Sequence, residues 1–257
     1  MRNLTNVHTY LVELRNIKLI LEYDGTSYHG WQRQPNLPTV QEAVEESLSR
    51  LFKEEIKVIA AGRTDAHVHA KGQVINFKTR ASLPIEAIKP ALNSYLPDDI
   101  RVKKAECVPL NFHARHDALK RTYRYIIYNH PFSSPFYRNF AWYIPDELSL
   151  EEMKKASRHL IGKHDFSSFQ AQGSPAPPVR RLERISIFKR EKFIITELTA
   201  DSFLYRMVRN IMGTLVEVGR GRLSPDEVRD ILEAKDRKFA GPTAPPQGLY
   251  LMWVEYG

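Results

Sequence analysis

Hydrophobic and polar residues alternate along the first half of the chain with the periods of strands and helices. An apolar-rich run at 17–23 predicts a strand. Apolar side chains then recur at helical spacing from Val40 to Phe52, directly after Thr39 and Glu42, which have the spacing of a capping box. The pattern therefore predicts a strand, a polar loop and a helix at the start of this half.

The rest of the first half predicts two more strands, a second helix and a closing strand. One strand ends at 60–61 and the next lies around 73–77. A helix starts near Pro84, where proline suits the first helical position, and the segment 100–108 has the pattern of a strand. The resulting order, β-α-β-β-α-β, is that of a ferredoxin-like unit.

The second half shows a similar order with more insertions. It begins with a strand at 121–128 and a helix introduced by a capping box from Ser149 to Glu152. After it we expect strands at 182–189 and 193–199, helices at 203–218 and from 224 onward, and a strand at 249–256. Because the halves are similar, we expect an α+β protein whose two ferredoxin-like units place antiparallel sheets side by side, with a central active-site cleft.

The predicted organisation has three parts. Residues 1–16 show no clear period and form an N-terminal arm. An N-terminal unit then spans 17–110, and a C-terminal unit spans 111–257. Within the second unit, the segment 170–178 contains Gly173 and three prolines, which predicts an inserted loop.

The composition is that of an ordinary globular protein with a basic surplus. The chain has 257 residues, 42% of them hydrophobic and 26% charged, which suits one or two folded domains and excludes disorder as the main state. Its net charge of +8 favours a polyanionic partner such as nucleic acid. Charge alone leaves an enzyme that merely happens to be basic equally open.

The single cysteine limits the chemistry further. Cys107 cannot form an internal disulfide or a zinc site with two thiolates, which favours a reducing compartment, and we expect a cytoplasmic protein. No apolar stretch approaches the ~18 residues of a membrane span, and the first sixteen residues lack a sustained apolar core, so we expect neither a membrane segment nor a signal peptide.

The densest polar cluster lies at 61–70, between two predicted strands. An irregular segment there presents side chains to a cleft, and it carries Asp65 two residues after Arg63. A simpler interpretation is that Asp65 caps a turn and Arg63 is a solvated charge. His67 and His69 alternate as on one face of a strand, so with Asp65 they allow a metal site. Because a lone pair of this kind is weak evidence, structural hydrogen bonding is the favoured interpretation of both histidines.

Basic residues of the second half gather near aromatic residues in three clusters. They are Arg115, Lys120, Arg121 and Arg124; then Arg180, Arg181 and Arg184; then Arg206, Arg209, Arg220 and Arg222. Arginine beside tyrosine suits an RNA backbone with stackable bases, although a solvated basic face gives the same pattern. Arg206 and Arg209 share one face of a predicted apolar helix, so a carboxylate partner is expected there.

Several motifs occur together and in order along the chain. They are YDGT at 23–26, GWQ at 30–32, GRTDAHVHAKGQV at 62–74, FHAR at 112–115, YRY at 123–125, DFSSF at 165–169 and MVRNI at 207–211. From about Ile17 to its last residue the chain closely resembles the tRNA pseudouridine synthase A family. It departs at His67, where the family usually has glycine, a residue that permits a positive φ.

The resemblance implies a reaction and its partners. Members of the family isomerise uridine to pseudouridine at positions 38, 39 and 40 of the tRNA anticodon stem-loop, without cofactor or metal. They act as homodimers in which one tRNA contacts both subunits. The bond from N1 of uracil to ribose is broken and rejoined through C5. A carboxylate can achieve this by attacking the uracil, by attacking the sugar or by taking a ribose proton, and the sequence leaves all three routes open.

The motif match also implies roles for five residues. Asp65 corresponds to the catalytic carboxylate and Arg209 to its ion-pair partner. Tyr123 matches the tyrosine that stacks on the target uracil and takes part in proton removal from C5. Arg63 resembles the arginine that holds the flipped nucleotide, and Leu249 is expected to form an apolar wall of the pocket.

Two other classes of function remain open at this point. Ferredoxin-like sheets also host non-catalytic RNA-binding modules, which would bind RNA without chemistry. A metal-dependent hydrolase using Asp65, His67 and His69 is the third possibility, and a chelator would inactivate it.

Overall fold

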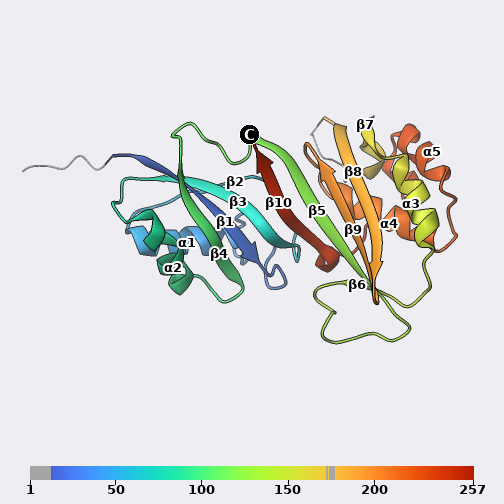
Figure 1. The fold of residues 1–257 in the computed structure, drawn as a ribbon, viewed down its shortest axis with the longest axis horizontal. Helices are drawn as coiled ribbons and strands as arrows, with labels where there is room; N and C mark the ends of the chain where they lie inside the picture. Colours follow the sequence, from blue (N-terminus) through green and yellow to red (C-terminus); the bar gives the residue numbers. More distant parts are fainter. Residues whose placement is uncertain (1–12, 172, 174–176) are drawn as a thin grey trace, which may run out of the picture.

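A computed structural model describes residues 13–171, 173 and 177–257 and shows a mixed α+β fold built on one large sheet (Figure 1). Its strands are β1 (Arg15–Tyr23), β2 (Ile59–Ala60), β3 (His69–Thr79), β4 (Ile100–Val108), β5 (Ala118–Asn129), β6 (Trp142–Ile144), β7 (Gly162–Asp165), β8 (Val179–Arg190), β9 (Phe193–Ala200) and β10 (Leu249–Tyr256). The described residues form five α-helices: α1 (Val40–Phe52), α2 (Ile85–Tyr95), α3 (Leu150–Arg158), α4 (Met207–Gly219) and α5 (Glu227–Ala234). The expected α+β class is confirmed.

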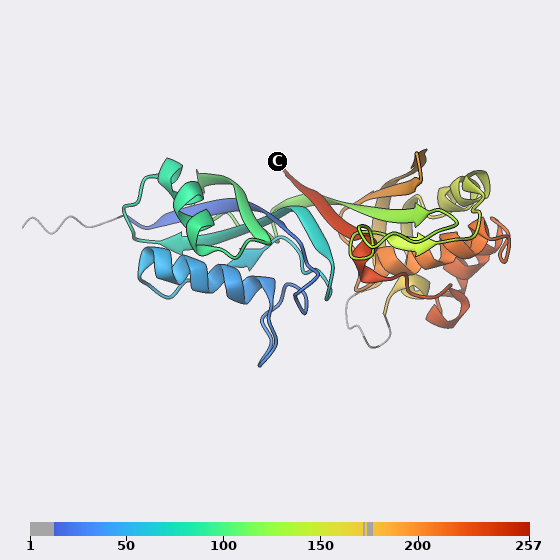
Figure 2. The ribbon, with the colours of Figure 1, turned by 90° about the horizontal axis from the view of Figure 1, so that it is seen from below.

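The sheet is continuous through both halves of the chain. Its order is β4-β1-β3-β10-β5-β9-β8-β7, with β2 on β3 and β6 on β5 (Figure 1). The last strand, β10, lies between the halves: it is parallel to β3 and antiparallel to β5. Figure 2 shows the two lobes that result, with β10 running between them. The halves therefore share one sheet through a parallel join, where we expected two antiparallel sheets side by side.

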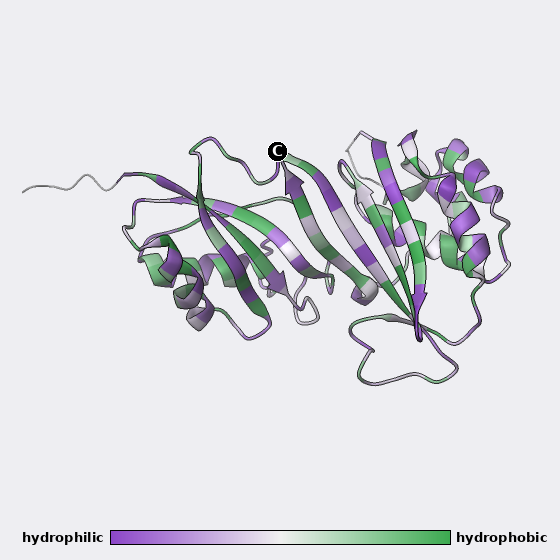
Figure 3. Cartoon of the chain, in the orientation of Figure 1, coloured by the Kyte–Doolittle hydropathy of each residue, from purple (hydrophilic) through white to green (hydrophobic). Residues whose placement is uncertain are grey.

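The strands carry the alternation expected of a sheet with a packed face. In β1 and β9, buried positions alternate with partly exposed ones over most of the length, and Figure 3 shows bands of hydrophobic and hydrophilic residues along the strands. Helices α1 and α2 belong to the lobe of β1 and β4, and α3, α4 and α5 to the lobe of β8 and β9 (Figure 1). Burial of one face against helices is the usual way such a sheet gains stability.

Two of the predicted helix starts are confirmed by side-chain caps. The Oγ1 of Thr39 accepts a hydrogen bond from the backbone N–H of Glu42 at the start of α1, and Ser149 does the same for Glu152 at the start of α3. Each cap satisfies a backbone donor that the helix itself leaves unpaired.

Several predicted boundaries were wrong. Strand β1 starts at Arg15, so the last two residues of the predicted N-terminal arm belong to the sheet; residues 1–12 of that arm lie outside the described residues. Pro84 caps α2 from outside, and the helix begins at Ile85. The strands β6 and β7, of only three and four residues, were missed because so short a run has no readable period.

The start of α4 differs most from its prediction. The helix begins at Met207, four residues after the expected start, because Arg206 adopts a left-handed conformation with φ of 60°. Arg206 and Arg209 therefore do not share a helix face. On the helix, Gly213 lets the segment 240–244 pass close by: a Cβ there would lie 1.6 Å from the carbonyl oxygen of Pro242.

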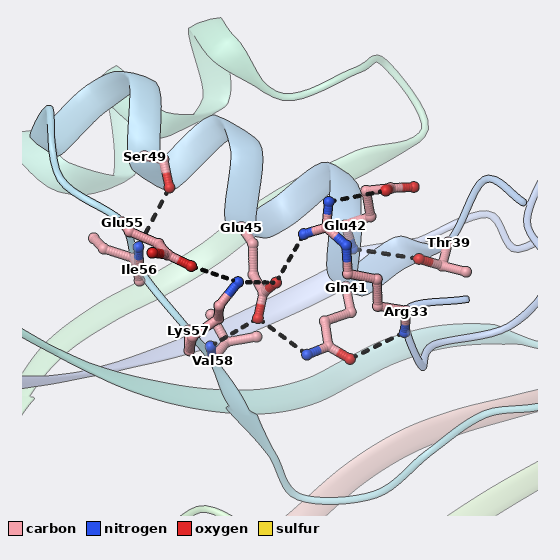
Figure 4. Close-up of polar contacts among 10 residues, drawn as sticks. All are labelled: Arg33, Thr39, Gln41, Glu42, Glu45, Ser49, Glu55, Ile56, Lys57 and Val58. Atoms are coloured by element: carbon pink, nitrogen blue, oxygen red, sulfur yellow. Dashed lines mark hydrogen bonds and ion pairs between the residues drawn. The ribbon is translucent and has the colours of Figure 1, made fainter. Parts of the chain in front are cut away.

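The buried carboxylate of Glu45, on α1, holds two neighbouring loop segments in place, one carrying Arg33 and the other carrying Val58. Glu45, 3% exposed, accepts hydrogen bonds at Oε1 from Gln41 Nε2 (3.0 Å) and from the N–H of Val58 (3.1 Å). Its Oε2 lies 3.4 Å from Arg33 Nη1 and 4.0 Å from Lys57 Nζ (Figure 4). Because a buried charge must be paired and hydrogen-bonded, this network fixes the loop that carries Arg33.

Candidate active site

The segment from Ala61 to Val68, called here the 61–68 loop, connects β2 to β3 and is tied down at its base. The N–H of Ala61 donates to the carbonyl of Val74 (2.8 Å), and Gln73 Nε2 donates to the carbonyl of Gly62 (2.8 Å). Because these hydrogen bonds hold Ala61 and Gly62 in place, the backbone that leads to Asp65 has little freedom to move.

Three further residues hold the same base. Thr64 shares a hydrogen bond of 2.8 Å with the buried hydroxyl of Tyr23, and its carbonyl accepts from the N–H of Trp31 (3.0 Å). Arg121, from the second half, donates to the carbonyl of Ala61 (3.1 Å). The base of the loop thus joins β1, the loop around Trp31 and β5.

Asp65 stands at the tip of the loop and is paired with an arginine 144 residues away in sequence. Arg209 Nη1, on α4, donates to Asp65 Oδ2 at 2.7 Å. The side chains are 12% exposed at Arg209 and 19% at Asp65, so the pair is largely but not completely removed from water. The carboxylate partner expected for Arg209 is therefore present, and the alternative in which Asp65 only caps a turn does not account for this contact.

Arg209 is itself held in place. Its Nε donates to the carbonyl of Ala244 (2.8 Å), and the N–H of Ala244 donates back to the carbonyl of Arg209 (3.0 Å). One guanidinium edge is thereby fixed by the backbone while the other meets the carboxylate. Such a preoriented cation stabilises an ionised carboxylate without further rearrangement.

Tyr123 lies on β5 close to the 61–68 loop. Its ring is buried and packs edge-on against Phe203, with centroids 5.1 Å apart. A Cβ placed on Gly62 would lie 3.9 Å from the Tyr123 hydroxyl, which makes no hydrogen bond within the described part of the chain. Burial, with the charges of Tyr23 and Asp65 adding, raises the pKa of Tyr123 far above its usual value, so the phenol is neutral at pH 7.

Leu249 and Arg63 complete the predicted set. Leu249, 6% exposed, opens β10 opposite Tyr125, while Leu251 lies opposite Tyr123, so these four side chains share one face of the sheet. Arg63 is exposed, and its guanidinium has no partner among the described residues. Leu249 is thus buried on the same face of the sheet as Tyr123, and the side chain of Arg63 is exposed.

His67 adopts the conformation that glycine would favour at its position. Its φ is 63°, a left-handed value that costs a residue other than glycine roughly 1–2 kcal/mol. The imidazole Nδ1 donates to the carbonyl of Thr26 at 2.8 Å, which offsets part of this strain. The glycine-to-histidine departure therefore preserves the turn.

His69 pairs with Tyr250 in the sheet, so its side chain lies on the face opposite to that of Tyr123 and Leu249. It does not contact Asp65. The N–H of Gly25 donates to its Nδ1 (3.0 Å), so its Nε2 donates to the carbonyl of Asn139 (2.9 Å). The ring stacks on Tyr250 at 4.7 Å, and burial lowers the pKa of His69. With His67 bonded to Thr26, the three residues of the metal hypothesis are not assembled, and no group of three metal-ligating side chains occurs in the part of the chain that the structure describes.

The predicted basic clusters are only partly available to a ligand. Arg121 donates to the carbonyls of Ala61, Arg115, Ala118 and Asp201, so its role is internal. Other members form ion pairs: Lys120 with Glu183, Arg124 with Glu197, Arg220 with Asp146 and Glu217, and Arg222 with Glu217. Within the described residues, Arg115, Arg181, Arg184 and Arg206 are exposed and form no ion pair.

Sequence reasoning missed the residues that hold the loop. Tyr23 and Gln73 lie in matched motifs, yet nothing in their spacing shows that they meet Thr64 and Gly62. Arg121 was interpreted as an RNA contact because a basic cluster does not reveal which of its members makes internal hydrogen bonds. The sequence carried one signal for these contacts: Tyr23 and Gln73 are bulky polar residues inside the predicted strands 17–23 and 73–77.

Comparison with known proteins identifies the class. The family model described as tRNA pseudouridine synthase matches residues 19–117 and 156–257, which include Asp65 and Arg209. The chain belongs to the tRNA pseudouridine synthase family, and it is therefore an isomerase.

Similar curated proteins bear a more particular name, tRNA pseudouridine synthase A. One from Thermoanaerobacter sp. (strain X514) is 51% identical over 95% of this chain and 100% of its own length. One from Acetivibrio thermocellus is 46% identical over 95% and 100%, and one from Buchnera aphidicola 44% over 94% and 92%. The chain thus spans nearly the full length of these relatives.

Among solved structures the likeness is weaker. A structure titled as an H/ACA RNP bound to a substrate RNA containing 2'-deoxyuridine matches 76% of this chain and 44% of that chain, at 10% identity and a TM-score of 0.37. A match at this level carries no argument about the site. No helix among the described residues is long and apolar enough to cross a membrane.

Proposed function

We propose that this pseudouridine synthase acts on uridines 38, 39 and 40 of the tRNA anticodon stem-loop, with Asp65 as its catalytic carboxylate. The observation that carries the assignment is the 2.7 Å contact between Asp65 and Arg209. It brings together two residues from separate halves at a partly exposed position, where a substrate base reaches the free carboxylate oxygen.

The pairing fits the demand of the reaction. When a base covers Asp65 and excludes water, desolvation disfavours the charged carboxylate. Arg209, held by Ala244, supplies a fixed positive charge that opposes this effect. The carboxylate remains an ionised nucleophile or base through the covered state.

The remaining roles follow from the same arrangement. Tyr123 stacks on the target uracil and takes part in removing the C5 proton, and Leu249 forms the apolar wall beside it. Arg63, exposed two residues before Asp65, holds the nucleotide that has left the stem. A neutral phenol removes the C5 proton only if its own proton passes to an acceptor, so in this proposal Tyr123 acts as a relay that hands its proton to water.

The reaction is balanced without an outside reagent. The bond between N1 and C1' breaks, a bond between C5 and C1' forms, the proton on C5 is lost and N1 gains one. Substrate and product are isomers and no electrons are transferred, so this proposal uses neither a redox cofactor nor a metal. Attack on the uracil, attack on the sugar and removal of a ribose proton all begin at Asp65.

The organisation of the protein is part of the proposal. Residues 17–110 and 111–257 form two ferredoxin-like units, supported by the order β4-β1-β3 with β2 beside β3 in the first. The enzyme works as a cytoplasmic homodimer in which one tRNA contacts both subunits. The net charge of +8 supports the polyanionic substrate.

The decisive experiment follows release of hydrogen from uracil C5. Transcripts of an anticodon stem-loop, each with one labelled uridine at 38, 39 or 40, are incubated with protein in the presence of a chelator. Wild-type protein releases the label at all three positions, while Asp65→Asn releases none and still binds RNA nearly as well. Robust release by Asp65→Asn would exclude the assigned carboxylate, and loss of wild-type activity in chelator would return the metal hypothesis.

A further inference from the structure

A basic pocket of about 470 Å³ lies beside the start of α4 and is not used by the proposed chemistry. Its polar lining consists of Tyr205, Arg206, Asn210, Arg237, Lys238 and Thr243. None of the described residues that line it is acidic. A concave site with three cationic side chains and no carboxylate attracts an anion.

Arg237 is a fixed charge without a neutralising partner. It donates to the carbonyl of Ala240 (3.0 Å), to Asn210 Oδ1 (3.2 Å) and to Thr243 Oγ1 (3.2 Å), all of which are uncharged. Thr243 also donates to Asn210 Oδ1 (2.7 Å), which locks the acceptors in place. Burial lowers the pKa of Arg237, and an anion in the pocket would offset this loss of hydration.

Arg206 supplies the second guanidinium, in a strained backbone conformation. Its φ of 60° places a residue other than glycine in the left-handed region, a type of outlier that clusters at ligand sites. The guanidinium lies 4.9 Å from the centre of the Tyr205 ring and has no carboxylate partner in the described residues. Lys238, at the rim, is paired with Asp236 at 3.0 Å. The two arginines therefore supply the uncompensated charge.

The pocket adjoins the catalytic pair through the chain itself. Asn210 directly follows Arg209 on α4, and Thr243 directly precedes Ala244, whose carbonyl accepts from Arg209 Nε. A ligand in the pocket and a base over Asp65 are therefore bound by neighbouring residues of the same two segments.

We propose that this pocket binds a backbone phosphate of the RNA substrate, on a nucleotide close to the uridine that reacts. The inference rests on the proposed function. The planar fork of Arg206 matches the paired oxygens of a phosphodiester, and Arg237, held by its three uncharged acceptors, adds a second fixed positive charge beside it. A phosphodiester carries one negative charge and needs no proton to bind. Binding there anchors the strand while the target base is turned toward Asp65.

The test combines a protein variant with a change at one phosphate. Arg206→Gln removes the charge at similar length, and stem-loop RNAs carry a single uncharged methylphosphonate at each phosphate near the target. We expect Arg206→Gln to raise Kd about tenfold and to lower the salt dependence of binding by about one phosphate contact. Arg206→Lys should restore part of the affinity.

A matched control and a double-variant comparison decide the outcome. Arg190, exposed at the end of β8, does not line the pocket, so Arg190→Gln should leave Kd unchanged. One methylphosphonate should weaken wild-type binding about tenfold and Arg206→Gln binding scarcely at all. If every methylphosphonate weakens both proteins equally, the pocket holds no phosphate. Failure of wild-type protein to modify the unaltered stem-loop would instead overturn the proposed function.

Discussion

The tip and the base of the 61–68 loop are held by different chemistry. At the tip, the charged pair of Asp65 and Arg209 remains partly exposed. At the base, Gln73 and Tyr23 bind buried polar groups of the loop through neutral hydrogen bonds. The difference separates two tasks, because the base fixes the backbone whether or not substrate is present while the tip keeps a charge accessible.

The two regions resemble each other in one respect, since each receives an arginine from the second half. Arg209 reaches the side chain at the tip, and Arg121 reaches the carbonyl of Ala61 at the base. The first neutralises a carboxylate and the second satisfies backbone oxygens. We therefore expect Arg209 to control activity and Arg121 to control stability.

The largest effect is expected from Arg209→Ala. Removal of one preorganised electrostatic contact typically costs on the order of 100-fold or more in rate. We expect that loss in the rate of C5 hydrogen release at saturating RNA, with a change in the free energy of unfolding of only about 1–2 kcal/mol.

The conservative variant provides the control for this prediction. Arg209→Lys keeps the charge and loses the bond to Ala244, so it should recover part of the rate. A rate like that of wild type in Arg209→Ala would show that another group holds Asp65 in its ionised state.

The next effect tests the base of the loop. Arg121→Met leaves four carbonyl oxygens without their donor, and we expect the free energy of unfolding to fall by about 2–4 kcal/mol. Thermal and urea unfolding measure this change. Activity per folded molecule should fall much less than in Arg209→Ala, because Asp65 keeps its partner.

Arg124→Met is the matched control on the same strand. Arg124 pairs with Glu197 at 2.6 Å and is one-third exposed, so its loss should cost at most about 1 kcal/mol. If Arg121→Met lowers the salt dependence of RNA binding and leaves stability unchanged, the cluster contacts RNA through this residue after all.

The two regions also differ in how far the sequence could predict them. A charged residue at 209 on an apolar helix demands an opposite charge, so the pair at the tip was predictable in kind, and the motif match supplied Asp65. Nothing comparable exists for the base. Gln73 and Tyr23 make neutral contacts between segments far apart in sequence, and neutral polar residues carry no signal of their partner.

The fold, too, was predictable from the sequence only where the signals are local. Periodicity and caps predicted α1 and α3, because those signals are local. The parallel contact of β10 with β3 involves only two residue pairs and joins segments about 180 positions apart, so it was not predictable from either strand. The start of α4 depends on the left-handed conformation of Arg206, which no residue preference would suggest.

A smaller effect is expected at the base of the 61–68 loop, where Tyr23 makes the free energy of unfolding depend on pH under alkaline conditions. Burial raises the pKa of Tyr23 above that of a tyrosine in the unfolded chain, which is about 10. The unfolded state therefore loses its proton first, and the free energy of unfolding falls as pH rises above about 10, by up to about 1.4 kcal/mol per pH unit for each such tyrosine. Urea unfolding between pH 7 and 11 measures the slope.

Tyr23→Phe separates this residue from the other buried tyrosines. It should cost about 1 kcal/mol at pH 7, through loss of the bond to Thr64, and should reduce the alkaline slope. An unchanged slope would mean that the hydroxyl of Tyr23 reaches water in the folded state.

The smallest effect is expected at the tip, from the strained backbone of His67. His67→Gly relieves the left-handed conformation but loses the bond to Thr26 and adds freedom to the unfolded chain, so stability should change by less than about 1 kcal/mol. His67→Ala loses the same bond and keeps the strain, and it should be less stable than His67→Gly by about 1 kcal/mol. Both variants should retain activity, because Arg209 rather than His67 holds Asp65. Equal stability of the glycine and alanine variants would show that the turn at 67 is unstrained, and a large loss of activity in both would place His67 in contact with the substrate.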